Sequence, residues 1–532
     1  MKTTTKRSRI ALALTMAGIL CGCTEFLREN DPNRITADNY FTTPEGLRDA
    51  VNGIYSPARS FIGQEEGYSV VVFGTDMFTE ASDESASWNS KQFNRYSSDL
   101  NARSEKIEQI WQNCYKGVNN ANTAIGRAEN VAMDEAQKNR LIAEARYLRA
   151  YYYFWLVRMY GPVPVKLHET KGVELDFGRG SETDVLTAVI DDLLFAAEHL
   201  DAKSAEWGRP SRWAARHFLA LAYLTRAKDS NDYQLALANA QEVINNSQHI
   251  LLPAYADLWK LDNQQNQEII WSIQFSPVES NNGGAGNRGH LFFLMEYDLA
   301  TYHMQRDVEN GRPFKRFRPT EHLLGLFADN DPRYDATFKT VWYCNSAQRL
   351  PSDGSLHLGD TCIYLPKHAM NPAAKASRPY AVINPDQYSP TTFPSVRKFD
   401  QPDRVDAADR DGSRDFIVFR LAETYLIAAE AAFRLNGTGA EYLNKVRARA
   451  QQPPLAQISI DAILDENARE FAGEGKRWFD LVRTGKLIER VRKYNPGAAA
   501  ENIRDYHVRR PIPQSEIDII HSDLFKQNEG YN

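Results

Sequence analysis

The sequence lacks the short motifs that mark the best-known hydrolases and nucleotide-binding enzymes. Neither a Gly-x-Ser-x-Gly elbow, a His-Glu-x-x-His zinc motif nor a phosphate loop ending in Gly-Lys-Ser/Thr occurs among its 532 residues, and its 11 histidines are scattered. Gly284–Gly289 matches the glycine pattern of a dinucleotide site, but a polar spacer, 279–283, separates it from the preceding apolar run. These absences predict a protein that is not an enzyme. A glycosidase stays an open alternative, because its two carboxylates leave no pattern in a sequence.

The chain also lacks a basic excess and, beyond its first twenty residues, any long apolar run. Its net charge is −6, whereas a nucleic-acid-binding protein needs a basic face to meet the phosphates. We therefore expect no nucleic-acid partner. A composition of 42% apolar and 25% charged residues is ordinary for a folded protein, and the length allows a large core.

The first 22 residues have the composition of a signal peptide. Lys2, Lys6, Arg7 and Arg9 precede a short apolar run, 10–20, which is too short to span a bilayer as a helix. Small Gly22 then precedes Cys23, as in bacterial lipoprotein signals, which this segment resembles. We predict cleavage after residue 22, acylation of Cys23 (with palmitate among the acyl chains), and a tether over 23–34 that leads to a body over 35–532.

Two alternatives remain for this segment. Cys21 is a rival acylation site, although bulky Leu20 precedes it, and a plain secretory signal with incidental cysteines is also compatible with the pattern. Removal of residues 1–22 takes away four cations, so the net charge falls from −6 to −10.

Only three of the five cysteines remain in the body of the protein. Cys114 lies in a helix-like stretch and is expected to be a small buried side chain. Cys344 and Cys362 flank a loop rich in glycine and proline, and in an oxidising compartment two such cysteines are candidates for a disulfide. A metal pair completed by His357 and His368 is the alternative, which is weaker because structural sites need four clustered ligands.

Helical periodicity dominates two blocks of the chain. One apolar face steps by four and three through Leu141, Ala145, Leu148, Tyr152, Trp155 and Met159. Gly161-Pro162 follows as a stop signal. We expect helices over 107–128, 141–159, 182–200, 211–227 and 233–245, and in the second block over 421–435, 440–450, 463–471 and 477–487.

This pattern predicts a mainly α fold of tetratricopeptide-like helix pairs (an α-α superhelix) with a loop-rich lobe that contains a few short strands. An irregular helical bundle is the alternative. We assign the helical scaffold to 35–63, 103–249 and 414–490, the lobe to 64–102 and 250–413, and a C-terminal tail to 491–532. Strand-like runs lie at 268–275 and 337–343.

The lobe holds the candidate binding residues. An aromatic ring in polar surroundings suits a sugar, because the ring stacks on C–H faces while polar neighbours bond the hydroxyls. The candidates are Trp88, Asn89, Tyr297, Tyr302, Trp342 and Tyr343. For each ring, burial beneath a long loop is the competing interpretation.

An acidic loop offers the only hint of a bound ion. Asp406, Asp409, Asp411 and Asp415 supply oxygen ligands of the kind that calcium prefers, but the loop lacks the glycine register of an EF-hand. A solvated loop is therefore the favoured interpretation, and we expect no cofactor and no metal, with a structural calcium as the alternative.

Motifs along the whole chain resemble those of one known family. They are Ile35–Phe41, Ala50–Tyr55, Trp111–Asn122, Glu144–Phe154, Arg420–Ala431, Leu443–Ala450, Glu470–Leu481, Pro511–Asp518 and Gln527–Tyr531. In this order they resemble the SusD/RagB-like nutrient-binding lipoproteins of Bacteroidetes outer membranes. The chain departs from the family pattern at Lys476, where histidine is common, and at Glu529, where proline is common.

The resemblance implies helix pairs beside a loop-rich lobe and implies no catalysis. It also implies a lipid-anchored protein of the cell outer membrane that faces the cell surface, covers a SusC-like TonB-dependent transporter and captures oligosaccharide on its lobe. Capture of another nutrient, such as peptide, and a scaffold that only stabilises the transporter are the alternatives. None of the matching motifs carries ligand residues.

Replacement of Cys23 tests the predicted anchor. We expect Cys23→Ala to leave folding and glycan affinity unchanged but to abolish membrane retention, because each acyl methylene contributes about 0.8 kcal/mol to membrane binding. Fractionation of cells that lack the transporter measures retention, and Cys21→Ala is the control that stays anchored. A Cys23→Ala protein that still fractionates with outer membranes would contradict the prediction.

Overall fold

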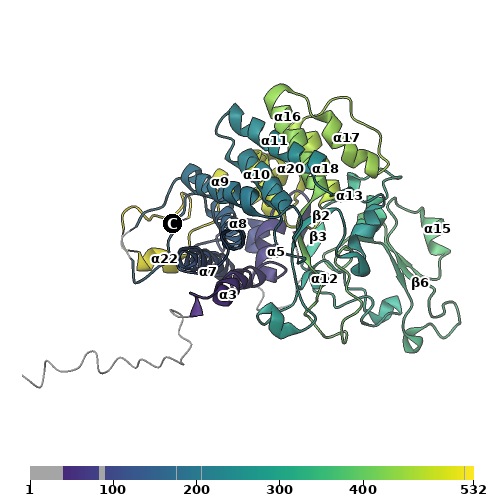
Figure 1. The fold of residues 1–532 in the computed structure, drawn as a ribbon. Helices are drawn as coiled ribbons and strands as arrows, with labels where there is room; N and C mark the ends of the chain where they lie inside the picture. Colours follow the sequence, from purple (N-terminus) through teal and green to yellow (C-terminus); the bar gives the residue numbers. More distant parts are fainter. Residues whose placement is uncertain (1–39, 83–89, 175–176, 205, 521, 532) are drawn as a thin grey trace, which may run out of the picture.

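Long antiparallel helices form the scaffold of the protein. The computed structural model describes residues 40–82, 90–174, 177–204, 206–520 and 522–531, so the predicted signal peptide, Cys23, Trp88 and Asn89 lie outside the described residues. The scaffold helices are α7 (Glu105–Ala128), α8 (Glu135–Tyr160), α9 (Glu182–His199), α10 (Arg212–Arg226), α11 (Ser230–Asn246), α16 (Leu421–Asn436), α17 (Ala440–Arg449) and α18 (Ile460–Glu470). Each packs against the next, from α7 to α18 (Figure 1). The prediction of tetratricopeptide-like helix pairs is confirmed.

Local sequence signals set the ends of these helices. Asp134 caps α8 by accepting a hydrogen bond from the backbone N–H of Gln137, and Ser181 and Asp184 form a capping box at α9. Gly161 ends α8 at a φ of 74°, as its sequence position predicts. Glycine is also required at position 117, because a Cβ there would lie 2.2 Å from the ring of Tyr152, where α7 and α8 approach each other.

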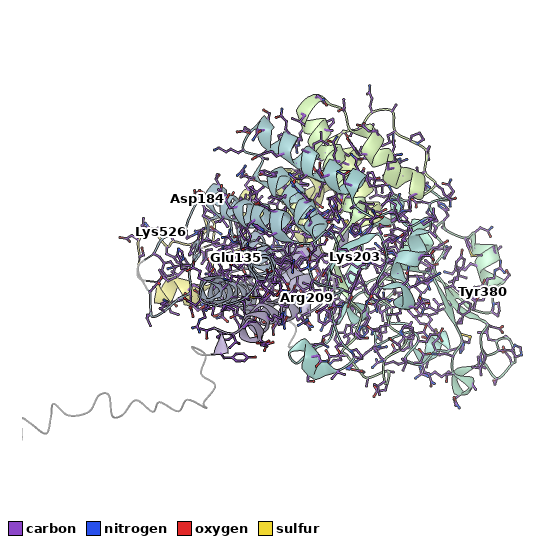
Figure 2. All side chains as sticks on the ribbon, in the orientation of Figure 1. Glu135, Asp184, Lys203, Arg209, Tyr380 and Lys526 are labelled. Carbon is purple, nitrogen blue, oxygen red and sulfur yellow. A yellow bond between two sulfur atoms is a disulfide. The ribbon has the colours of Figure 1, made fainter. Side chains whose placement is uncertain are left out.

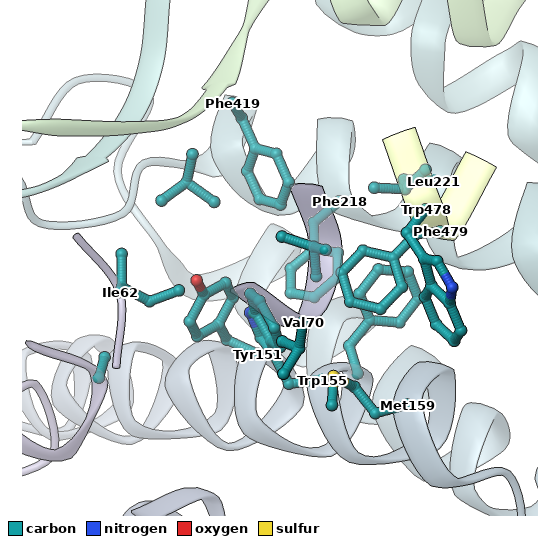
Figure 3. Packing of buried hydrophobic residues seen from close by; sticks show 14 of the residues in the cluster. Ile62, Val70, Tyr151, Trp155, Met159, Phe218, Leu221, Phe419, Trp478 and Phe479 are labelled. Atoms are coloured by element: carbon teal, nitrogen blue, oxygen red, sulfur yellow. The ribbon is translucent and has the colours of Figure 1, made fainter. Parts of the chain in front are cut away.

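The main core joins the scaffold to the segments that pack on it. In Figure 3, Tyr151 and Trp155 of α8 lie near Phe419 and Phe479, which come from the second helical block. The ring of Trp155 lies 5.1 Å from that of Phe61 and 5.2 Å from that of Phe479, both edge to face. The N-terminal and C-terminal halves of the chain therefore share one core.

Two segments differ from the sequence-based assignment. Residues 64–102 were assigned to the lobe, but they include helix α5 (Glu65–Val72), which packs against α7 and belongs to the main core. Its run of valines is buried on all sides, so it shows no helical periodicity. The predicted helix over 477–487 is two helices, α19 (Arg477–Arg483) and α20 (Leu487–Tyr494), separated by Gly485 at a φ of 71°.

The remaining helices lie at the two ends of the scaffold and in the lobe. They are α3 (Pro44–Asn52), α4 (Ser56–Arg59), α6 (Gln92–Arg95), α12 (Gly289–Phe292), α13 (Glu321–Gly325), α14 (Arg333–Thr337), α15 (Pro372–Ala376), α21 (Ala498–Asn502) and α22 (Gln514–Ile519). Short 3-10 helices occur at Tyr255–Trp259, Leu261–Asn263, Glu279–Asn282, Ala300–Tyr302, Ala347–Arg349, Pro385–Gln387 and Asp505–Val508. The tail returns to the scaffold, where the Asn528 side chain donates to the carbonyls of Tyr160 (2.9 Å) and Arg510 (2.8 Å). Among the described residues, no helix is long and apolar enough to span a bilayer.

Short strands form the remaining regular structure, and all of those given below except β9 lie in segments assigned to the lobe. They are β1 (Phe78–Glu80), β2 (Ile269–Ile273), β3 (Phe317–Pro319), β4 (Phe338–Lys339), β5 (Val341–Tyr343), β6 (Thr361–Tyr364), β7 (Ala381–Val382), β8 (Ser395–Val396) and β9 (Phe416–Arg420). The pairs β1–β3, β2–β9 and β4–β8 are antiparallel, and β5–β6–β7 form a three-stranded sheet. The predicted strand over 268–275 is confirmed as β2, whereas 337–343 is the end of α14 followed by β4 and β5. In Figure 2, Tyr380 lies in the lobe, at the opposite end of the molecule from Lys526.

Buried ion pairs connect the lobe to the second helical block. Arg333 of α14 donates to Glu466 (2.7 Å) and Glu470 (2.9 Å) of α18, and all three side chains are fully buried. Arg420 of β9 donates to Glu268 at 3.0 Å and also bonds Glu470. A buried charge is costly unless it is paired, so these contacts require α14, α18, β2 and β9 to assemble together.

The buried ion pairs of Asp76 make the stability of the protein depend on pH. The Asp76 carboxylate accepts hydrogen bonds from Arg477 (2.7 and 2.6 Å) and Arg490 (2.6 Å). Burial alone would raise the pKa of Asp76, but the two guanidinium groups overcome that effect and lower the pKa to about 2. The stabilisation is therefore present above about pH 4, where an unfolded Asp ionises, and is lost as the pH falls toward 2.

Replacement of Asp76 tests this pH-dependent stabilisation. We expect Asp76→Asn to lower the free energy of unfolding at pH 7 by about 3–5 kcal/mol, because two buried guanidinium groups lose their shared partner. The difference from the unmodified protein should shrink below pH 4, as measured by denaturant unfolding at several pH values. Asp523→Asn, at an exposed position, is the matched control. Equal unfolding midpoints for the two variants at pH 7 would contradict the prediction.

Candidate functional site

The lobe has a hydrophobic core of its own, separate from the main core. It consists of Ala81, Leu294, Met295, Tyr297, Met304, Trp342, Cys344, Leu356, Cys362, Ile363, Leu365 and Phe393. Cys344 and Cys362 form a disulfide within it, as predicted, and Cys114 is a buried free cysteine, as predicted. The disulfide closes the loop between β5 and β6 and so restrains the segment that follows Tyr343.

Two of the predicted ligand-binding rings form the centre of this core. Trp342 and Tyr297 stack at 4.5 Å with an angle of 14° between the rings, and both side chains are 0% exposed. The Tyr297 hydroxyl donates to the carbonyl of Gly311 at 2.5 Å, and the Lys339 ammonium lies 4.2 Å from the Trp342 ring centroid. The expectation of ligand contact is thus corrected for both residues, because each ring faces the other instead of solvent.

The neighbouring tyrosines are placed differently. Tyr343 is 56% exposed, because alternate side chains of a strand point to opposite faces and Trp342 takes the inner face of β5. Tyr302 is half-buried at the edge of the lobe core, with its hydroxyl 3.5 Å from that of Thr392. The Asn345 side chain donates to the carbonyl of Gln305 at 2.7 Å, so the segment that follows Tyr302 lies beside the end of β5.

Trp88 and Asn89 lie outside the described residues, but the chain on either side of them is placed. Ala81 belongs to the lobe core, and the N–H of Ser82 donates to the carbonyl of Pro390 at 2.7 Å. Ser90 is buried where the described chain resumes. The described chain thus stops at Ser82, beside the core that holds Tyr297 and Trp342, and resumes at Ser90.

The acidic loop does not gather its carboxylates around one point. Asp411 pairs with Arg288 at 2.8 Å, Asp415 accepts from the indole N–H of Trp207 at 3.0 Å, and Asp406 accepts the N–H of Ala408 at 2.7 Å. Among the described residues there is no group of three or more potential ligands that could hold a metal ion. These contacts give the three carboxylates roles in loop structure, and the expected absence of a metal and the calcium alternative both stay predictions.

The glycine-rich run at 284–289 has a structural explanation. Asn287 and Gly412 form a short antiparallel bridge, with N–O distances of 2.8 and 3.0 Å. A Cβ on Gly286 would lie 2.5 Å from the carbonyl oxygen of Gly412, so a side chain does not fit there. The glycines allow two backbones to approach each other, which supports the conclusion that this run is not a nucleotide loop.

A polar cavity of about 980 Å³ lies on the scaffold, away from the lobe. Its charged lining is largely paired internally: Arg149 bonds Asp192 at 2.8 and 2.7 Å, and Arg127 bonds Glu169 at 2.8 Å. Among the described residues no Phe, Tyr or Trp lines it, and its one ring is the imidazole of His168. It therefore lacks the large ring surface on which a sugar would stack, whereas the lobe presents Tyr343.

Sequence reasoning missed the polar groups around Tyr302 and Tyr343. Arg306 lies four residues after Tyr302 and pairs with Asp298 at 2.8 Å, and Gln305 contacts Asn345. The sequence did carry two usable signals. Alternation along β5 separates Trp342 from Tyr343, and arginines recur at positions 306, 312 and 316 in the loop before β3 and at position 318 within β3.

Comparisons with known proteins agree with this architecture. The family model described as "SusD family" matches residues 267–531, and the one described as "Starch-binding associating with outer membrane" matches residues 25–224. The fold places the chain among helical-repeat proteins that carry a loop-rich lobe. The chain belongs to the SusD family.

Individual relatives match over most of their length. The chain is 28% identical to SusD-like protein P25 of Formosa agariphila, covering 96% of each chain. It is 26% identical to the starch-binding protein SusD of Bacteroides thetaiotaomicron, covering 75% of this chain and 74% of SusD. The solved structure of a laminarin-binding SusD-like protein superposes with a TM-score of 0.68 at 24% identity, covering 92% of this chain and 100% of that chain, and so supports the fold.

Substitutions of Trp342 and of Tyr343 test the assignment of these adjacent residues to opposite faces of β5. We expect Trp342→Ala to destabilise the lobe by about 3–5 kcal/mol, because it leaves a cavity in the core. Tyr343→Ala should change stability by no more than about 0.5 kcal/mol, because its ring is exposed. Thermal denaturation and hydrogen exchange of the lobe measure both effects. Similar losses in the two variants would show that the strand faces are assigned incorrectly.

Proposed function

We propose that this protein captures an oligosaccharide or polysaccharide on the exposed face of its lobe and delivers it to a partner TonB-dependent outer-membrane transporter resembling SusC. The observation that carries the proposal is the match of two SusD-type family models over residues 25–224 and 267–531. A starch-binding relative and a laminarin-binding structural neighbour support a glycan as the ligand.

The lobe has chemistry suited to such a ligand. The exposed ring of Tyr343 offers a stacking surface, and the exposed Gln305, which Asn345 holds beside the end of β5, lies nearby to bond hydroxyl groups. Tyr302 has a polar tip at the edge of the same core, and Trp88 and Asn89 remain candidates from the sequence. Trp342 and Tyr297 support this face from below. No bond in the ligand needs to be broken for capture, so the proposed role is not enzymatic.

The anchor fits the same role. Acylated Cys23 would hold the protein at the outer membrane, facing the cell surface, and residues 24–34 would serve as a leash. The body could then swing over a transporter while remaining attached. The family description, which associates such proteins with the outer membrane, supports this location.

A binding assay tests the proposal directly. Calorimetry or affinity electrophoresis on plant, host and microbial polysaccharides is expected to give at least one ligand. Tyr343→Ala should weaken its binding about tenfold, the equivalent of about 1.4 kcal/mol, because one stacking surface is removed. Leu358→Ala is the matched control: Leu358 is 57% exposed on the same lobe, close to the 56% of Tyr343, and carries no ring.

The outcomes separate the parts of the proposal. Absence of binding to every glycan would contradict glycan capture and favour a non-glycan nutrient or a scaffold role. Unchanged binding in Tyr343→Ala and Trp88→Ala would remove these residues from the site while leaving glycan capture in place. Release of product from a labelled oligosaccharide would contradict the non-enzymatic role.

A further inference from the structure

A tight turn on the lobe surface carries an arginine at each end. The N–H of Gly311 donates to the carbonyl of Asp307 at 3.1 Å, and Gly311 has a φ of 82°, so the chain reverses between Arg306 and Arg312. The buried Tyr297 hydroxyl holds the Gly311 carbonyl, and Lys339 holds the Asn310 side chain at 2.7 Å. The lobe core therefore fixes the position of this turn.

A second loop brings another arginine to the same place. The buried Arg404 side chain donates to the carbonyl of Val308 at 3.1 Å and to that of Asp409 at 2.8 Å, which ties residues 404–410 to the turn. Arg312 reaches across to the carbonyl of Ala408 at 3.1 Å, two residues from Arg410. Arg306, Arg312 and Arg410 thus form one group, here called the arginine cluster.

The cluster brings like charges close together. Partial burial, followed by the charges of Arg306 and Arg410, lowers the pKa of Arg312 from its ordinary value, so both of these arginines lie close enough to repel Arg312. Arg306 has a carboxylate partner, Asp298 at 2.8 Å. Within the part of the chain that the structure describes, no ion pair to a carboxylate joins Arg312 or the exposed Arg410.

Several neighbouring carboxylates accept hydrogen bonds from the loops that carry them. Asp307 accepts hydrogen bonds from the backbone and side chain of Asn310, and Asp406 accepts the N–H groups of Ala408 and Asp409. Asp409 accepts the N–H of Asp411. Burial lowers the pKa of Lys339, and the charges of Asp400, Glu309 and Asp307 oppose that effect. These carboxylates keep their negative charge, but among the described residues none is paired with Arg312 or Arg410, so these two guanidinium groups can meet an external anion.

We propose that the arginine cluster binds the anionic substituent of an acidic polysaccharide, a sugar carboxylate or sulfate ester, and so selects the class of glycan captured. Guanidinium groups bind such planar or tetrahedral oxyanions with two parallel hydrogen bonds. Tyr302 lies four residues before Arg306, and the contact between Gln305 and Asn345 links this segment to the end of β5, beside Tyr343. One sugar chain could therefore stack on the tyrosines and meet the cluster. The inference rests on the glycan capture proposed above.

Binding of charged and uncharged polymers tests the inference. The detergent-solubilised mature protein is titrated with polygalacturonate, a sulfated galactan, starch and laminarin. We expect at least one acidic polymer to bind, and its affinity to fall steeply as NaCl rises from about 0.05 M to about 0.5 M. Which acidic polymer binds distinguishes a carboxylate from a sulfate ester.

Substitutions assign the binding to the cluster. Arg312→Gln and Arg410→Gln should each weaken binding of the acidic polymer about tenfold, because each removes a charged hydrogen-bonding group, and Arg312→Lys should lose less. Arg378→Gln, at another exposed lobe arginine, is the matched control and should bind as the unmodified protein does. Thermal melting of every variant establishes that folding is retained.

The possible failures are distinct. Unchanged affinity for the acidic polymer in the Arg312→Gln, Arg410→Gln double variant would overturn the role of the cluster. Binding of starch or laminarin alone would overturn the acidic ligand class while leaving glycan capture intact. Absence of binding to all four polymers and to the wider glycan panel would overturn the proposed function itself.

Discussion

Glu470 is the point at which the charges of the scaffold and the lobe meet inside the protein. Arg333 from the lobe, Arg420 from β9 and Arg449 from α17 all donate to this one carboxylate, which is fully buried. Removing ions from water costs several kcal/mol each, and only good geometry with complete hydrogen bonding offsets that cost. The three arginines lower the pKa of Glu470, so it stays ionised in spite of its burial. The scaffold and the lobe are therefore coupled by charges that tolerate little displacement.

Buried side chains also hold the lobe together, but here they are stacked aromatic rings and a disulfide instead of ion pairs. Its long loops have little regular structure, so side chains must fix their positions. The Trp342–Tyr297 stack and the Cys344–Cys362 disulfide provide the rigid centre, and the Tyr297 hydroxyl extends it to the turn at Gly311. Loops that carry binding groups need such a support, because ordering them at the moment of binding would reduce affinity. The buried rings of Tyr297 and Trp342 thus hold the surface loops in place without lying on the surface themselves.

This division explains how one fold can serve many ligands. The scaffold depends on helix packing and on buried ion pairs, which leave little freedom for change. Side chains at the lobe surface, such as the exposed Tyr343 and Arg410 and the half-buried Arg312, contribute little to either core and can differ among relatives without loss of the fold. Relatives at 26% to 28% identity therefore share the architecture, while each ligand must be worked out from the surface of each lobe.

The helices of the scaffold could be predicted because their signals are local. Apolar periodicity placed α7 to α11 and α16 to α18, and Gly161 marked the end of α8. The loop between Cys344 and Cys362 was short enough to predict the disulfide. In contrast, α5 was missed because a helix buried on all sides has no polar face, and the division at Gly485 depends on a backbone angle that composition does not reveal.

Only the tertiary structure decided which lobe residues face solvent. Trp342 and Tyr343 are adjacent and equally aromatic, yet the pleat of β5 buries one and exposes the other. The partners of Glu470 lie between 21 and 137 residues away in the chain, and those of Arg312 come from a loop that Arg404 holds in place. The sequence by itself determined the helical scaffold and made the disulfide a candidate, because both depend on residues that lie near one another along the chain, and the signal peptide stays a prediction. The tertiary structure decided the lobe surface and the buried charges, because those depend on segments that meet only when the chain folds.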